Sequence, residues 1–258
     1  TEAVPRGEVT RPRDLLAWAG LSLVACVTML GATELVAAEL GSSPLAWVGP
    51  FAAYLLSFMV VFSGKCPGWM RPAAVIGLML GLTGFMFEKG LSALPLAGPG
   101  FFSLILAVAS TSFIGNDLLY RRRPAVRFER FYLALAAGGV AGGLLVSVVL
   151  PYVFAQPIEF IAGSTVLYLC ALFPPGERTP SGAVKFAGIL ALIPLAGLAY
   201  LTVRLDQGAG SVTKYVRNAY GHVATRITTS HDQSKVELLS QSTVHGSQLH
   251  LDPRSEEH

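Results

Sequence analysis

Charged residues are scarce in this 258-residue chain, since Asp, Glu, Lys and Arg make up 14% of it and apolar residues make up 52%. Soluble domains carry about a quarter charged residues. The shortage is local: the first 203 residues contain 13 Lys/Arg and 10 Asp/Glu, whereas the last 55 contain six of each. This distribution excludes an ordinary soluble domain over the first 203 residues. It predicts a membrane module followed by a small polar tail.

Cysteine is also rare, and Cys26, Cys66 and Cys170 have no CxxC spacing, so we predict neither a disulfide framework nor a cysteine metal site. All five histidines lie in the tail, but His245 and His250 are five residues apart, not the four of a helical zinc pair. Neither a GxSxG elbow nor a glycine-rich turn between a strand and a helix is found in the sequence. We therefore predict no catalytic residue, no metal site and no cofactor site.

Long apolar runs fill the first 203 residues, each close to the ~20 residues that a helix needs to cross ~30 Å of hydrocarbon. They are rich in Ala, Leu and Gly and lack the period-two alternation of strands. We predict an all-α integral membrane bundle of about seven transmembrane helices over residues 14–203, after a cytoplasmic segment over 1–13. The third and sixth segments are short, so either is a candidate not to cross. The segments are 14–38, 45–62, 73–87, 100–120, 131–154, 159–174 and 183–203.

The basic residues between these segments predict the orientation of the bundle. If the N-terminus is cytoplasmic, the cytoplasmic segments hold twelve basic residues and the opposite loops hold Lys89 alone. The positive-inside rule therefore places the N-terminus in the cytoplasm, and the same topology explains the net charge of +3 without nucleic-acid binding. Seven full crossings would then place the tail outside the cytoplasm. The twelve are Arg6, Arg11, Arg13, Lys65, Arg71, Arg121, Arg122, Arg123, Arg127, Arg130, Arg178 and Lys185.

The tail, residues 204–258, has the sequence pattern of a small β-rich unit. Residues 211–229 alternate apolar and polar side chains and are rich in Val, Tyr, Ile and Thr. Residues 235–240 and 243–251 are two further strand candidates. We predict a small antiparallel sheet of three strands. Such a sheet needs a partner surface to be stable.

Glycine and acidic residues within the apolar runs are the candidates for packing and function. Gly138/Gly142 and Gly139/Gly143 form two overlapping GxxxG pairs in the fifth segment, which predict close helix packing, either within the bundle or with another subunit. Glu34 and Asp117 are acidic residues near segment ends, and they are candidates for an intramembrane polar site. The run Arg121–Arg123 follows Asp117 closely, so a local ion pair is the simpler interpretation.

Several short motifs follow one another along the whole chain. They are SPLAWVGPFAAYLLSF at 43–58, NDLLYRRRP at 116–124, RFYL at 130–133, GGVAGG at 138–143, RNAYG at 217–221, TVHGSQ at 243–248 and LDP at 251–253. In this order they resemble bacterial membrane-embedded spermidine synthase-like proteins, which fuse a multi-helix membrane region to an aminopropyltransferase-type domain. The resemblance implies a bacterial inner-membrane protein whose tail corresponds to the first strands of that domain. It also implies that His245 and Gln248 border a substrate pocket when the domain is complete.

The chain also departs from this family. Gly115–Asn116 replaces the Cys-His pair that usually precedes the acidic residue and the basic run. The glycine-rich loop for an adenosyl cofactor and the acidic residues that position the amine are missing, because the sequence stops at His258. The resemblance therefore implies the membrane region of such a protein without its cofactor-binding domain.

Three functions are compatible with these observations. We favour a non-catalytic membrane scaffold or accessory subunit, whose partners are the lipid bilayer and other subunits or a second copy, bound through the GxxxG helix and the β tail. The second hypothesis is the N-terminal portion of a longer membrane-bound aminopropyltransferase-like enzyme. The third is a transporter of a small cation such as a polyamine, with Glu34, Glu39 and Asp117 as the candidate cation ligands.

Overall fold

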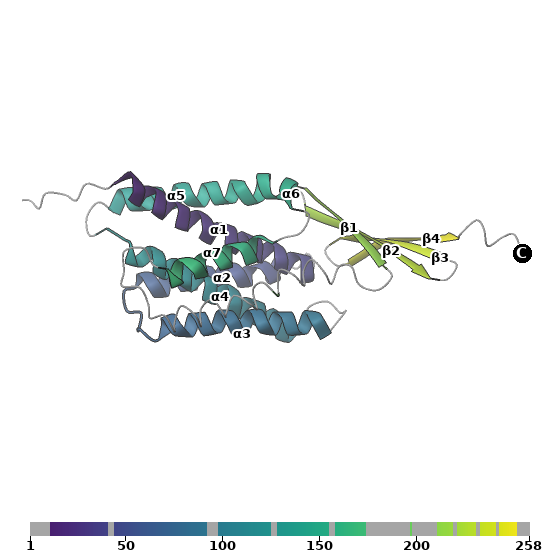
Figure 1. Ribbon diagram of the computed structural model, residues 1–258, viewed down its shortest axis with the longest axis horizontal. Coiled ribbons are helices and arrows are strands. Elements are labelled where there is room, and N and C mark those ends of the chain that lie inside the picture. Colours follow the sequence, from purple (N-terminus) through teal and green to yellow (C-terminus); the bar gives the residue numbers. More distant parts are fainter. Residues whose placement is uncertain are drawn as a thin grey trace, which may run out of the picture.

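The structure is a computed structural model that describes seven α-helices, one π-helical turn and four strands. Its described backbone covers residues 11–40, 44–91, 98–124, 128–154, 158–173, 197, 211–218, 221–230, 233–240 and 243–251. Side chains of residues 37–47, 86–98 and of the strands lie outside this description. The helices lie side by side with their axes roughly along one direction, with α3 at one edge of the bundle and α5 at the other (Figure 1).

The helices coincide closely with six of the seven predicted apolar segments. The seventh, 183–203, lies outside the described residues apart from Gly197. The third segment is longer than predicted, because α3 continues past residue 87 to Leu91. The elements are α1 (Pro12–Leu40), α2 (Pro44–Phe62), α3 (Met70–Leu91), α4 (Gly98–Arg121), α5 (Phe128–Leu144), η1 (Leu145–Val149), α6 (Leu150–Val153) and α7 (Glu159–Leu172).

Three described helices are long and apolar enough to cross a membrane: Pro12–Val36, Pro99–Arg121 and the continuous helix Phe128–Val153. The last carries exposed Tyr132 and Tyr152 near its two ends. These tyrosines are 20 positions apart (152 − 132), about 30 Å at the α-helical rise of ~1.5 Å. Tyrosines at such a separation match the two interfaces of a bilayer. The chain is therefore a helical membrane protein.

The helix α4 is the centre of the bundle, and residues 110–119 are buried without exception. Its neighbour α3 approaches it through a face of small residues. A Cβ atom added to Gly81 would lie 2.6 Å from the backbone nitrogen of Ala107, and one added to Gly77 would lie 2.5 Å from Ser110 Oγ. This contact between α3 and α4 was not among the predictions from the sequence. Gly77 and Gly81 form a GxxxG pair that could have revealed it.

The helices α1 and α5 run parallel and pack closely near their N-terminal ends. Trp18 and Phe131 meet edge to face with ring centroids 5.3 Å apart. The Trp18 indole Nε1–H donates to the Arg122 carbonyl at 2.8 Å, and Ser22 Oγ donates to the Leu135 carbonyl at 2.7 Å. These contacts tie α1 both to α5 and to the end of α4.

Replacing Trp18 with Phe is expected to lower the free energy of unfolding by about 1 kcal/mol, because the Arg122 carbonyl loses its indole donor while most of the ring packing remains. Trp69→Phe is the matched control, since Trp69 is 68% exposed and its change should cost less than about 0.5 kcal/mol. Reversible unfolding in mixed detergent micelles measures both. Equal losses would contradict a structural role for the Trp18 indole.

A π-helical turn, η1, interrupts the long helix before Pro151. The Leu150 amide donates to the Leu145 carbonyl, five residues earlier. Pro151 has no N–H to offer the Ser147 carbonyl, and its ring clashes with an ideal α-helical turn before it. Widening that turn accommodates the proline without breaking the helix. The apolar run consequently continues to Val153.

The tail contains four strands in one antiparallel sheet of order β1–β2–β3–β4, rather than the three predicted. They are β1 (Ser211–Asn218), β2 (Gly221–Ser230), β3 (Gln233–Ser240) and β4 (Thr243–Leu251). The range 211–229, predicted as one strand, is split where Asn218 pairs with Gly221. Both residue types favour tight hairpins. Figure 1 draws the sheet beyond the end of the bundle at which α6 lies.

Candidate functional site

The basic side chains that the structure describes gather at one end of the bundle. The start of α1, the end of α4 and the start of α5 meet there through the Trp18 contacts, and α3 joins them through Arg71 and Asp117. Alternating helix directions bring the ends together, although they are far apart in the sequence (Figure 1). We call this the basic end. Its cations are Arg11, Arg13, Lys65, Arg71, Arg121, Arg122, Arg123 and Arg130.

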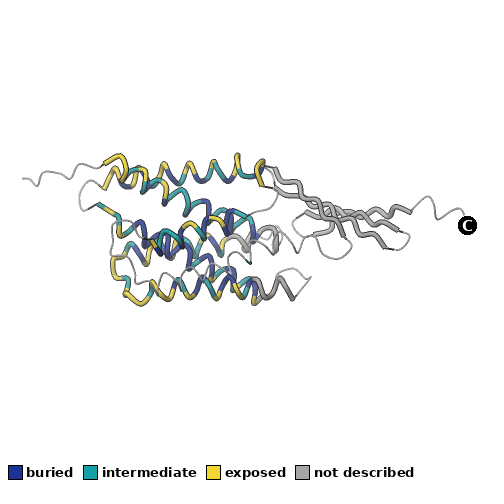
Figure 2. The backbone as a smooth tube through the Cα atoms, viewed as in Figure 1, coloured by how far each residue is buried: buried dark blue, intermediate teal, exposed yellow. Residues whose placement is uncertain are grey.

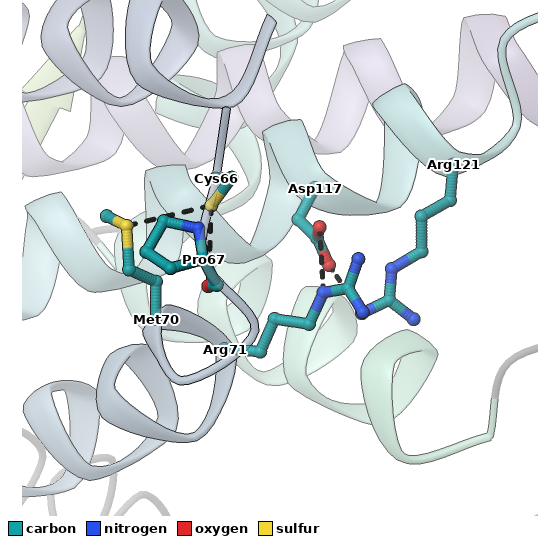
Figure 3. A network of polar contacts seen from close by, with 6 residues as sticks. All are labelled: Cys66, Pro67, Met70, Arg71, Asp117 and Arg121. Carbon is teal, nitrogen blue, oxygen red and sulfur yellow. Dashed lines mark hydrogen bonds and ion pairs between the residues drawn. The ribbon is translucent and has the colours of Figure 1, made fainter. Parts of the chain in front are cut away.

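Asp117 is the acidic centre of the basic end, and two arginines bind it from different helices. Its Oδ1 lies 3.2 Å from Arg71 Nε, and its Oδ2 lies 2.7 Å from Arg121 Nη2. The Asp117 side chain is 10% exposed. Figure 3 shows both guanidinium groups turned toward this carboxylate. The predicted local ion pair with the basic run is therefore present. Arg71, on α3, is a second partner that the sequence did not indicate.

Asn116, beside Asp117, is completely buried and joins α4 to α2. Its Nδ2 donates to Ser57 Oγ at 2.8 Å, and Ser57 Oγ donates to the Tyr54 carbonyl at 2.7 Å. Further along α4, Thr111 Oγ1 and Ser164 Oγ of α7 lie 3.3 Å apart. These contacts join α4 to α2 on one side and to α7 on another. They satisfy the Asn116 Nδ2 donor and hydroxyl groups that would otherwise be costly in an apolar interior, whereas Asn116 Oδ1 has no hydrogen-bond partner among the described residues.

The acidic residue Glu34 does not join Asp117, because it lies near the C-terminal end of α1, whereas the N-terminal part of α1 meets the end of α4 that carries Asp117. Glu159, which was not among the predicted site residues, is 2% exposed in the first turn of α7. There the backbone of α7 approaches Gly31, where an added Cβ would lie 2.8 Å from Glu159 Cβ. Its position at the boundary of a predicted segment concealed its burial from the sequence.

The overlapping glycine pairs of α5 face different surroundings. Gly138 and Gly142 pack on α1: a Cβ at Gly142 would lie 2.8 Å from the Leu23 carbonyl, and a Cβ at Gly138 would overlap the Ala19 carbonyl. A Cβ at Gly139 would lie 3.9 Å from Ser22 Oγ, and one at Gly143 would meet no atom of the described residues within 4 Å. One pair therefore packs within the bundle, and the other is available for lipid or a further helix.

Two sulfur atoms lie together in the connection between α2 and α3. Cys66 Sγ is 3.6 Å from Met70 Sδ (Figure 3). Among the described residues, no group of three or more His, Cys, Asp and Glu side chains is placed to hold a metal ion. The contact packs the connection against Met70, the first residue of α3.

The tail residues implied by the resemblance lie on β4. Gln248 pairs with Val236 of β3. Val244 pairs with Leu239 and Gly246 with Leu238, so His245 is the additional residue of a β-bulge. Bulges redirect side chains and recur beside active sites. The side chains of His245 and Gln248 lie outside the described part of the structure, so their contribution to a substrate pocket remains a prediction.

The described site is thus a set of ion pairs and hydrogen bonds that fasten α2, α3, α4 and α7 together, with its charged part at the basic end. Comparison with known proteins adds no relative, since no protein-family model, no curated protein and no solved structure matches the chain.

Proposed function

We propose that the chain is a non-catalytic membrane scaffold, or accessory subunit, whose helix bundle anchors a β-sheet for another polypeptide. The observation that carries the proposal is that buried polar groups of the bundle bind one another across helices. Asp117 binds Arg71 and Arg121, and Asn116 binds Ser57. These contacts fasten helices to one another, which is the requirement of a scaffold.

The sheet supports the same role. In the order β1–β2–β3–β4, each edge strand has a single neighbouring strand. An edge strand presents unpaired backbone N–H and C=O groups that can accept a further strand. We propose that a partner polypeptide, or a second copy of this chain, adds a strand at β1 or β4.

We also propose that the chain crosses a bacterial inner membrane seven times, with the N-terminus and the basic end in the cytoplasm. The positive-inside rule supports this orientation, since the described cations gather at one end. An odd number of crossings then puts the tail on the other side. Alkaline phosphatase fused after residue 258 should be active, whereas a fusion after Arg123 should be inactive. The reverse pattern would overturn the orientation.

A second candidate is the N-terminal portion of a longer membrane-bound aminopropyltransferase-like enzyme. The bulge at His245, within the motif that resembles the synthase-like domain, favours it. A cation transporter is less well supported, because two arginines already occupy Asp117.

Two measurements separate the scaffold from the enzyme. The first is the intact mass of the chain purified from its own membrane, compared with 27.3 kDa. The second is aminopropyl transfer to putrescine by the purified protein. A mass near 27.3 kDa and no transfer are expected for the scaffold. A mass larger by the ~20–25 kDa of a further domain, with measurable transfer, would replace the scaffold with the enzyme.

A further inference from the structure

The guanidinium of Arg71 has binding capacity that the bundle does not use. Its Nε is bonded to Asp117 Oδ1, while its two Nη groups have no hydrogen-bond partner among the described residues. Arg71 lies in the first turn of α3, and its side chain is 50% exposed. An exposed guanidinium with two free amino groups matches a phosphate oxygen pair.

The surroundings of Arg71 carry an excess of positive charge. Arg121 shares the Asp117 carboxylate, so this trio alone has a net charge of +1 (two cations and one anion). Arg123 adds a third cation, with its guanidinium carbon 3.9 Å from the centre of the Tyr120 ring. Lys65 is exposed in the connection that leads into α3. A ligand with a net negative charge is therefore favoured over a neutral one.

The outer face of α3 indicates that a negatively charged ligand at Arg71 would come from the lipid bilayer. Ile76 and Leu80 are 58% and 62% exposed on one face of the helix, and Trp69, just before α3, is 68% exposed. Figure 2 shows exposed positions recurring along α3 at the edge of the bundle. Exposed apolar residues below a tryptophan are typical of a helix that borders lipid, with the indole at the headgroup level. Arg71 is two residues from Trp69 and hence lies at that level.

We propose that Arg71, with Arg121 beside it and Lys65 in the connection that leads into α3, binds the headgroup phosphate of an anionic phospholipid at the basic end. Asp117 competes with the lipid for the same guanidinium groups and limits the affinity. The proposal rests on the contact of α3 with lipid and is independent of the scaffold role.

The test is native mass spectrometry of the full chain in detergent, titrated with phosphatidylglycerol or phosphatidylcholine. Phosphatidylglycerol should be retained preferentially. Arg71→Gln should weaken its retention about fivefold, the effect of one basic residue at a membrane surface. Arg13→Gln, an equal change of charge at the same end, should weaken it less than twofold. Asp117→Asn should strengthen retention, because it removes the carboxylate that binds Arg71.

Each alternative has a distinct outcome. Equal retention of the two lipids, or equal losses in Arg71→Gln and Arg13→Gln, would overturn a site at Arg71. Displacement of the lipid by millimolar inorganic phosphate would assign the site to a free anion instead. If Arg71→Gln does not fold, Lys65→Gln takes its place, because the Lys65 side chain makes no hydrogen bond or ion pair within the described residues. It should weaken phosphatidylglycerol retention about twofold, and unchanged retention would count against the site.

Discussion

Gly138→Ala should destabilise the bundle by about 1–3 kcal/mol, the usual cost of overpacking. The added methyl group would meet the backbone carbonyl of Ala19, which cannot turn aside as a flexible side chain can. α1 and α5 must then separate, and the Trp18–Phe131 contact is strained with them. Reversible unfolding in mixed detergent micelles, followed by tryptophan fluorescence, measures the loss.

Gly143→Ala is the matched control for this change, on the same helix and with the same added atom. Within the part of the chain that the structure describes, an added Cβ there meets nothing within 4 Å. Alanine also favours a helix over glycine by about 1 kcal/mol, so this variant should be as stable as the original chain or more stable. Opposite signs for the two variants are the expected result. Destabilisation by Gly143→Ala would instead reveal a helix packed on that face, such as that of a second copy.

Asp117→Ala should lower the free energy of unfolding by about 1–2 kcal/mol. Both arginines lose their shared carboxylate, and a buried ion pair that loses one partner is costly. The loss is reduced because the Arg71 and Arg121 side chains are 50% and 26% exposed, so water replaces part of the interaction. Unfolding at low ionic strength, where screening is weakest, gives the clearest measurement.

Asp14→Ala is the matched control for Asp117→Ala. Asp14 is exposed, and its Oδ2 accepts one hydrogen bond, from the Arg11 amide at 3.2 Å. Its removal should cost no more than the ~0.3–1 kcal/mol of a charge at a helix N-terminus. In a double-mutant cycle, Arg71→Gln and Asp117→Ala should show coupling, because their side chains share one contact. Additive losses would mean that the ion pair contributes nothing.

The sequence by itself determined where the helices lie. Six predicted segments reappear as helices, and three of the described helices are long and apolar enough to cross a membrane. A chain in hydrocarbon must satisfy its backbone internally, which demands long apolar runs that composition reveals. The pair Asp117–Arg121 was also visible, since residues four apart on a helix are neighbours. In the tail, alternation located the strands but did not divide residues 211–229 between β1 and β2.

Only the tertiary structure decided which groups meet across helices. Arg71 reaches Asp117 over 46 positions of sequence, and the choice of Gly138 over Gly143 for packing depends on the rotation of α5 against α1. Glu159 is buried because α7 packs closely against α1 at Gly31. Composition fixes which segments enter the membrane, because that depends on each residue's own transfer free energy. Contacts between segments depend on how whole helix faces fit together, which no single segment encodes.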